Sequence, residues 1–245
     1  MEVKILIAGD SAVSIQLGEE ISLEVNQLVR SLFLELTKNP IDGIVEMVPT
    51  YASLMIHYKQ EIIRYDQLKE ELFERINSMN PEEVQKSERQ IVKELPICYG
   101  GELGPDLEDC AAYEQISVEE FIRMHSQHEY YVYMLGVAPG HPYMARFEEP
   151  FHFKRRETPR VRISAQSIVV QENLSNLIPF EQPCGWNIIG ATPLIACDYA
   201  KEDPFLIHAG DWVRYVPISL VEFHKIQEQV NKGTYSMKTY EKVVE

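Results

Sequence analysis

The residues with the greatest potential for chemistry gather in one stretch, residues 129–143. Its first part, 130–135, is aromatic, β-branched and apolar, which predicts a buried strand. Glycines and prolines then follow closely, so the backbone groups of this turn must bond other protein atoms, water or a ligand. We predict a turn that binds a small molecule, and a tight turn with core tyrosines is the alternative. The candidate binding residues are Tyr133, Gly136, Pro139, Gly140 and His141.

A short basic cluster lies further along this otherwise acidic chain. Its members are Lys154, Arg155, Arg156, Arg160 and Arg162. The planar guanidinium of Arg matches a carboxylate through two parallel hydrogen bonds, so Arg160 is a candidate for binding an acidic small molecule. The alternative is a solvated loop whose charge offsets nearby carboxylates.

Two more side chains are candidates for a pocket. His125 could transfer protons, because the pKa of an unperturbed imidazole lies near neutrality; alternatively it is a cation at a helix C-terminus. Trp186 could form the floor of a pocket, with a buried core Trp as the alternative. His125 and His128 are spaced for one helix face but have no third ligand, so no metal site is predicted.

Several catalytic and cofactor motifs are absent from the sequence. It contains no G-x-x-x-x-G-K-[ST] phosphate loop, no G-x-S-x-G elbow and no H-E-x-x-H zinc motif. We therefore expect that the chain binds neither ATP nor another cofactor by itself. The cysteines lack C-x-x-C spacing and are expected to be reduced thiols; they are Cys98, Cys110, Cys184 and Cys197.

The elements that position these residues fall into two halves. In the first half, short apolar strands alternate with helices whose apolar residues recur at three- and four-residue spacing. The first helix is expected to stop at Asn39-Pro40 and the second near Asn80-Pro81. The predicted order is strand, strand, helix, strand, strand, helix, at residues 3–7, 12–17, 21–36, 44–48, 54–58 and 68–76. This order favours a small α+β sandwich with two helices on one sheet.

The second half begins with a strand at 91–95. Short strands between glycines and prolines follow from 130 to 218, a pattern that favours a closed or nearly closed β-barrel. Asp106 is a predicted helix cap, and the capping boxes at Ser117 and Ser219 start two more helices. The last helix should end at Lys232-Gly233, before a polar tail.

The polar stretch 81–89 is the predicted linker, and a continued exposed helix is the alternative. It divides the chain into predicted domains of residues 1–88 and 89–245. The fold class is therefore α+β, with a small N-terminal α/β sandwich domain followed by a β-barrel domain.

The composition restricts the class of partner. The chain has 245 residues, of which 45% are hydrophobic and 25% charged, as is typical of a globular protein. Its net charge of −15 disfavours nucleic acids and anionic membranes as partners. No apolar run is long enough to span a bilayer or to serve as a signal peptide, so a cytoplasmic location is expected.

Four ordered motifs resemble those of a known family. They are Y-M-L-G-V-A-P-G-H-P-Y at 133–143, L-P-I-C-Y-G-G with G-P-D-L at 95–107, P-C-G-W-N-I-I-G-A-T-P-L at 183–194 and A-G-D-W-V-R-Y-V-P-I at 209–218. Together they resemble the signatures of the allophanate hydrolase subunit 1 family, which includes the B subunit of 5-oxoprolinase and a sporulation-kinase inhibitor. The resemblance covers nearly the whole chain.

The resemblance implies a cyclophilin-like β-barrel for the second domain. It also implies a component, similar to the 5-oxoprolinase B subunit, of a complex that opens 5-oxoproline to glutamate at the expense of ATP. The implied partners are a homologous, carboxyltransferase-like C-type subunit and an A-type subunit that holds ATP and magnesium, and this chain would be inactive alone. The alternatives are a regulatory protein that inhibits a sensor histidine kinase, or a relative with a changed substrate.

The sequence departs from the family pattern between residues 164 and 178. Family glycines are replaced here by Gln166, Val169, Glu172 and Asn176. Larger side chains fill space that a ligand close to the backbone would need. We therefore expect this altered loop to hinder substrate binding, which favours a regulatory role.

Overall fold

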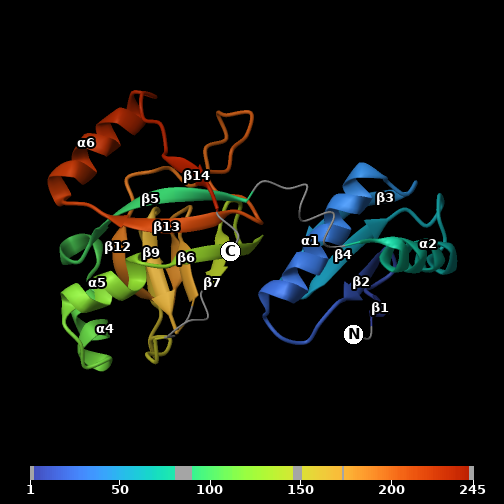
Figure 1. The fold of residues 1–245 in the computed structure, drawn as a ribbon, viewed down its shortest axis with the longest axis horizontal. Helices are drawn as coiled ribbons and strands as arrows, with labels where there is room; N and C mark the ends of the chain where they lie inside the picture. Colours follow the sequence, from blue (N-terminus) through green and yellow to red (C-terminus); the bar gives the residue numbers. More distant parts are fainter. Residues whose placement is uncertain (1–2, 81–89, 146–150, 173, 243–245) are drawn as a thin grey trace. The chain divides into compact units, whose positions relative to one another are not determined.

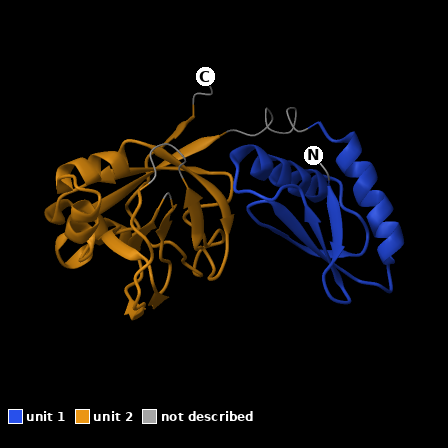
Figure 2. Ribbon diagram, turned by 90° about the horizontal axis from the view of Figure 1, so that it is seen from below, with its two compact units in different colours: residues 1–89 blue, residues 90–245 orange. Residues whose placement is uncertain are grey.

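The structure is a computed structural model that describes residues 3–80, 90–145, 151–172 and 174–242. It divides into two compact units, residues 1–89 and 90–245 (Figure 2). The predicted linker at 81–89 lies outside the described residues. The mixed α+β class predicted from the sequence is confirmed.

The 1–89 unit is a four-stranded antiparallel sheet with two helices. Its strands lie in the order β1-β2-β4-β3. The elements are β1 (Lys4–Ile7), β2 (Ala12–Gln16), α1 (Leu23–Lys38), β3 (Ile44–Pro49), β4 (Ser53–Tyr58) and α2 (Tyr65–Ser78). Strand residues such as Ile15 and Ile56 pack against helix residues such as Leu32 and Leu68 in one buried cluster. The sandwich predicted from hydrophobic spacing is therefore observed.

The 90–245 unit is a closed barrel of seven strands with one added edge strand. Around the barrel the order is β12 (Asn187–Ala191), β9 (Ser167–Gln171), β10 (Leu174–Leu177), β7 (Pro142–Ala145), β6 (Glu129–Leu135), β13 (Trp212–Pro217) and β5 (Ile91–Tyr99). Pairing of Gly190 with Tyr99 and of Ala191 with Cys98 closes the ring. β5 and β13 run parallel, whereas the other barrel neighbours are antiparallel.

Helices lie outside the barrel, gathered toward one side of it in Figure 1, and two further strands form a separate ribbon. The helices are η1 (Gly101–Leu103), α4 (Leu107–Tyr113), α5 (Val118–Ser126) and α6 (Leu220–Asn231). The ribbon pairs β8 (Arg160–Ile163) with β11 (Gln182–Cys184). Ser117 caps α5 and Ser219 forms the predicted capping box of α6. Asp106 is the N-cap residue of α4, as predicted, but its carboxylate makes no cap hydrogen bond.

The polar tail contains a strand that the sequence analysis missed. β14 (Thr239–Glu241) pairs antiparallel with the start of β5. The side chain of Glu129 accepts a hydrogen bond from the Tyr240 hydroxyl at 2.8 Å and another from Lys242. Lys242 also lies over the ring of Trp212, 3.8 Å from its centroid. A three-residue strand is too short to give a periodic pattern, and these side-chain contacts from other elements hold it in place.

We expect the tail to detach in acid. Burial works to raise the pKa of Glu129, but hydrogen bonds from Lys242 and Tyr240 outweigh it and hold the pKa below its ordinary 4.5. The ionised carboxylate therefore stabilises the tail above that value, and the contribution is lost as the pH falls through the lower folded-state pKa. The Glu94 amide bonds the tail carbonyl of Lys238, so its protection from hydrogen exchange, relative to the intrinsic exchange rate at each pH, should fall over this range. Glu129→Gln should exchange quickly already at pH 7, and unchanged protection in that variant would contradict the expectation.

Candidate functional site

A cavity of about 680 Å³ lies in the 90–245 unit between the ribbon, the end of β12 and helix α6. Arg160 and Arg162 line it from β8, and the turn that follows β8 contributes Gln166. Thr192 follows β12, and His224 comes from α6. The lining thus combines cations, hydroxyls, amides and the carboxylate of Glu102 with apolar residues, as small-molecule sites commonly do.

The arginine predicted to bind an acid lines this cavity, but a buried carboxylate already holds it. Both terminal nitrogens of Arg160 donate to Asp106, each at 2.7 Å. Arg156 donates to the same carboxylate at 2.9 Å, and the amide of Ile188 does so at 2.7 Å. The hydrogen bonds to Asp106 raise the pKa of Arg160. A ligand carboxylate must therefore share Arg160 or draw it away from Asp106.

The rest of the basic cluster is also partly neutralised. Arg162 pairs with Glu181 at 2.5 Å across the ribbon. Arg155 covers Gly185, where an added Cβ would lie 2.2 Å from its Nε atom. The cluster thus contributes two arginines to the cavity wall, and carboxylates offset both of them.

The altered turn keeps a backbone conformation that glycine normally provides. Gln166 has φ of 64° and Glu172 has φ of 51°, both in the left-handed region. The amide of Gln166 donates to Ile178 at 2.6 Å, and its carbonyl accepts from Thr192 at 3.0 Å. These bonds hold the turn in its strained form, so the loss of glycine has not collapsed the scaffold. The added side chain of Gln166 instead lines the cavity.

The turn at 136–143 is closed by its own hydrogen bonds. Gly136 donates to His141 at 3.0 Å, and His141 donates to Ala138 at 3.1 Å. Gly140 has φ of 72°, and an added Cβ would lie 3.0 Å from Cys197. The backbone groups predicted to meet a ligand are therefore partly satisfied inside the turn. Of the predicted binding residues, Tyr133 and Gly140 are buried, Gly136 is half-buried and Pro139 is exposed, and none of them lines the cavity.

His141 is a buried, neutral imidazole. Asn176 lies 3.3 Å from Nε2 and Gln182 lies 3.4 Å from Nδ1. The carbonyl of the Asn176 side chain accepts from the Met144 amide, so its NH₂ group faces Nε2 of His141. Burial lowers the pKa of His141 to about 4. At neutral pH this ring therefore orients the turn and carries no charge.

His125 lies inside the barrel rather than at the cavity. Its Nδ1 atom is 2.7 Å from the hydroxyl of Tyr99, and its Nε2 atom is 2.9 Å from Ser175 Oγ. Ser175 is in turn 2.7 Å from the hydroxyl of Tyr215, whose ring stacks on that of His125. The side chain is fully buried and lies in the last turn of α5. Proton transfer by His125 stays a prediction, and the geometry favours a role in holding the core together.

Trp186 packs in a small apolar cluster below the cavity. Its neighbours there include Ile163 and Ile188, which also line the cavity. Trp186 itself does not line the cavity. It packs against the residues that form the cavity wall.

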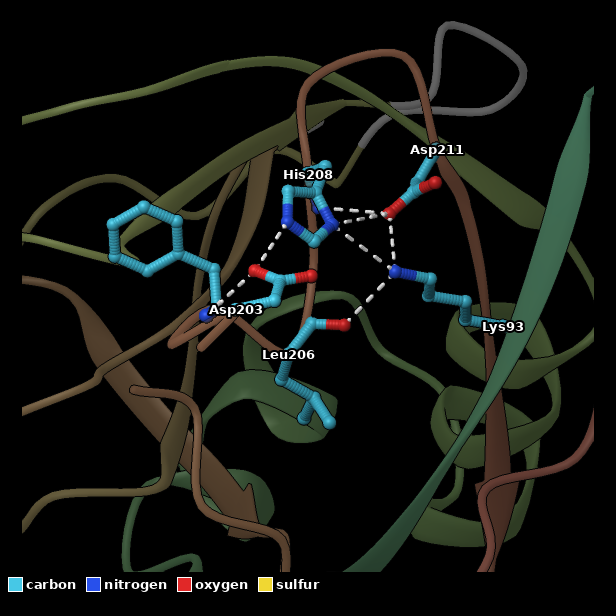
Figure 3. A network of polar contacts seen from close by, with 6 residues as sticks. Lys93, Asp203, Leu206, His208 and Asp211 are labelled. Carbon is cyan, nitrogen blue, oxygen red and sulfur yellow. Dashed lines mark hydrogen bonds and ion pairs between the residues drawn. The ribbon is translucent and has the colours of Figure 1, made fainter. Parts of the chain in front are cut away.

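Figure 3 shows a polar network that the sequence analysis missed, which we call the loop clamp: Lys93, Asp203, His208 and Asp211. Lys93 on β5 donates to Asp211 at 2.7 Å and to the carbonyl of Leu206 at 3.0 Å. Nε2 of His208 lies 3.0 Å from Asp203, and the His208 amide donates to Asp211 at 2.7 Å. The clamp fixes the loop after β12 to the barrel. Of these four residues, only Asp211 belongs to one of the motifs found in the sequence. Lys93 and His208 are 115 positions apart, so the sequence spacing could not indicate that they are in contact.

Within the described residues, no helix is long and apolar enough to cross a membrane. The same part of the chain has no group of three or more His, Cys, Asp or Glu side chains that could hold a metal ion.

Sequence comparison finds named relatives along nearly the whole chain. Residues 3–207 match the family model described as carboxyltransferase domain, subdomain C and D. The chain is 36% identical to the 5-oxoprolinase B subunit of Bacillus subtilis (strain 168) over 233 residues, which cover 91% of this chain and 96% of the relative. It is 31% identical to the 5-oxoprolinase B subunit of Escherichia coli O157:H7, covering 86% and 94% of the two chains.

Structural comparison gives the same fold in longer chains. TTHA0988 matches with a TM-score of 0.74 and 27% identity over 86% of this chain, which spans only 40% of that longer protein. The urea carboxylase of Kluyveromyces lactis matches with a TM-score of 0.77 and 18% identity, covering 98% of this chain and 24% of the enzyme.

Proposed function

This chain belongs to the family of the carboxyltransferase domain, subdomain C and D, and from this premise we propose that it is the B component of an ATP-dependent 5-oxoprolinase complex. The observation that carries the proposal is the 36% identity to a named 5-oxoprolinase B subunit over 91% of the chain. Identity of this extent along both proteins supports a shared role within a complex.

The cavity offers groups that suit 5-oxoproline. This molecule has a carboxylate and a lactam, and its opening to glutamate is the hydrolysis of the ring amide. Arg160 and Arg162, each also paired with a carboxylate of this chain, provide N–H donors for the substrate carboxylate, while Thr192 provides a donor and an acceptor for the lactam. In this proposal the chain binds and orients the substrate.

ATP chemistry is assigned to another component of the complex. The sequence has no glycine-rich phosphate loop. We propose that an A-type subunit holds ATP and magnesium and that a carboxyltransferase-like C-type subunit completes the complex. Co-expression of the three chains, followed by size-exclusion chromatography with light scattering, tests this assembly. Separate elution of this chain at micromolar concentrations would overturn it.

Gln166 is expected to narrow the substrate cavity. Gln166→Gly removes the side chain and suits the positive φ, so the KM of the assembled complex for 5-oxoproline should fall by about tenfold. Gln166→Ala is the matched control for backbone strain, because it widens the cavity but keeps a Cβ at this φ. Gln166→Ala should lower KM by a similar factor, but its melting temperature should not exceed that of the wild type. Equal KM values in all three proteins would show that Gln166 does not meet the substrate.

A further inference from the structure

Arg160 has an edge that Asp106 leaves free. An arginine carries five N–H donors, one on Nε and two on each terminal nitrogen. Each terminal nitrogen of Arg160 gives one of its donors to Asp106 at 2.7 Å, and the described residues offer no further partner. The Nε atom is not among the buried polar atoms that lack a partner, so it is open to solvent. Nε and the terminal nitrogen beside it form a second edge, which can bind another carboxylate through two parallel hydrogen bonds.

This free edge lies on the cavity side of Arg160. The Arg160 side chain is 28% exposed and lines the cavity. The Asp106 side chain is 3% exposed and does not line it. The end of the guanidinium that holds Asp106 is therefore turned into the wall, and the solvent-open Nε edge is the part that a ligand can reach.

Asp106 fixes the guanidinium in one orientation. Its Oδ1 atom accepts from Arg156 and Arg160, and its Oδ2 atom accepts from Arg160 and the amide of Ile188. Each oxygen thus accepts two hydrogen bonds, which uses the acceptor sites of both. Because Ile188 belongs to β12, the carboxylate is tied to the barrel. An arginine held at two points in this way loses little further freedom when a ligand binds it.

The charges around Asp106 also suit an acidic ligand. Arg156 and Arg160 are two cations around one carboxylate, so the cluster keeps one positive charge. The other arginine of the cavity wall is arranged differently, because Arg162 gives its Nε atom to Glu181. Of these two lining arginines, Arg160 is therefore the one whose Nε edge is open to a ligand.

We propose that the substrate carboxylate binds the Nε edge of Arg160 while Asp106 keeps the opposite end, so that Asp106 is a positioning residue of the site. The ligand then shares Arg160 and does not displace Asp106. This assignment rests on the proposed function, because 5-oxoproline is taken as the acid that enters the cavity. It narrows the ligand class to small acids whose carboxylate can accept two parallel hydrogen bonds.

Calorimetric titration of the full chain with 5-oxoproline, without ATP or another subunit, tests this arrangement. Arg160→Lys keeps a cation for Asp106 but cannot present a two-donor edge to each of two carboxylates, so Kd should rise by about 30-fold. Arg155→Lys is the matched control, because Arg155 is exposed and does not line the cavity. It should bind 5-oxoproline as the wild type does.

Asp106→Asn tests the positioning role. Its amide cannot accept from the same four donors, so Arg160 loses its two-point support and Kd should rise by about tenfold. The titration is made in about 0.3 M salt, which screens the change in charge. Tighter binding would overturn the positioning role, because it is the result expected if Asp106 competes with the ligand.

A double variant separates positioning from an effect on folding. If Asp106 acts through Arg160, then Asp106→Asn should add nothing to Arg160→Lys, and the double variant should bind about 30-fold more weakly than the wild type. A loss of about 300-fold, the product of the two single effects, would overturn the positioning role. Melting curves establish that each variant is folded at the temperature of the titration.

The outcomes also separate this arrangement from the proposed function. Unchanged binding by Arg160→Lys would overturn the shared arginine, whether or not Asp106→Asn folds. Absence of 5-oxoproline binding by the wild-type chain would overturn it as well, whereas glutamate release by the assembled complex tests the function separately. Binding that depends on Arg160, in a complex without turnover, would support the shared arginine and reject the function.

Discussion

Replacing Asp106 with Ala is expected to lower the free energy of unfolding of the 90–245 unit by about 3 kcal/mol. The carboxylate is only 3% exposed and accepts from Arg156, Arg160 and the amide of Ile188. Its loss leaves two arginines without their counter-ion and one buried amide without its acceptor. The arginines keep about a third of their surface in water, which limits the effect to the low end of the range for broken buried pairs.

Thermal melting measures this effect, and the melting temperature should fall by roughly 6–12 °C. Asp109→Ala is the control, because Asp109 is an exposed acid in the first turn of α4. It should change the melting temperature by no more than about 2 °C. Similar melting of the two variants would show that the arginine–aspartate cluster does not hold the cavity wall to α4 and β12.

Replacing His125 with Ala should have an effect of similar size, again about 3 kcal/mol. The substitution empties a buried space beside the ring of Tyr215 and removes the partner of Tyr99 and Ser175. The Tyr99 hydroxyl then loses His125 as a hydrogen-bond partner and Ser175 keeps only its bond to Tyr215, which adds to the loss. Urea unfolding at pH 7 would measure it, with Gln127→Ala on the exposed C-cap of α5 as the control.

The same position distinguishes a core role from proton transfer. If His125 holds the core, the activity of the assembled complex should fall only as far as the fraction of folded protein falls. A variant such as His125→Asn that stayed as stable as the wild type but lost all turnover would restore the predicted catalytic role.

Local pattern was enough to predict most elements of the fold. The helices of the 1–89 unit follow from apolar spacing, and Asn39-Pro40 marks the end of the first helix. The sequence predicted a closed or nearly closed barrel, but not which strands pair to close it. Closure depends on β5 pairing with β12 and β13, which are far away in sequence and carry no local sign of their partner.

The site was predictable in its residue types but not in their partners. Arg160 lines the cavity, and its hydrogen bonds go to Asp106, a residue that the local sequence marked only as a helix cap. The turn glycines and prolines suggested ligand contacts, whereas the observed bonds run within the turn and to the loop of Cys197. The positive φ angles of Gln166 and Glu172 could not be predicted from the sequence, because Gln and Glu rarely adopt this conformation.

The most direct test is the release of glutamate from 5-oxoproline by the reconstituted complex with ATP and magnesium. We expect ATP-dependent turnover by the three components together, none when this chain is omitted, and none from this chain alone. Turnover should be strongly reduced by Arg160→Ala and retained in Val221→Asn, since the first residue lines the cavity and the second is exposed on α6. An intact complex that releases no glutamate would contradict the proposal and favour a regulatory binding role for this chain.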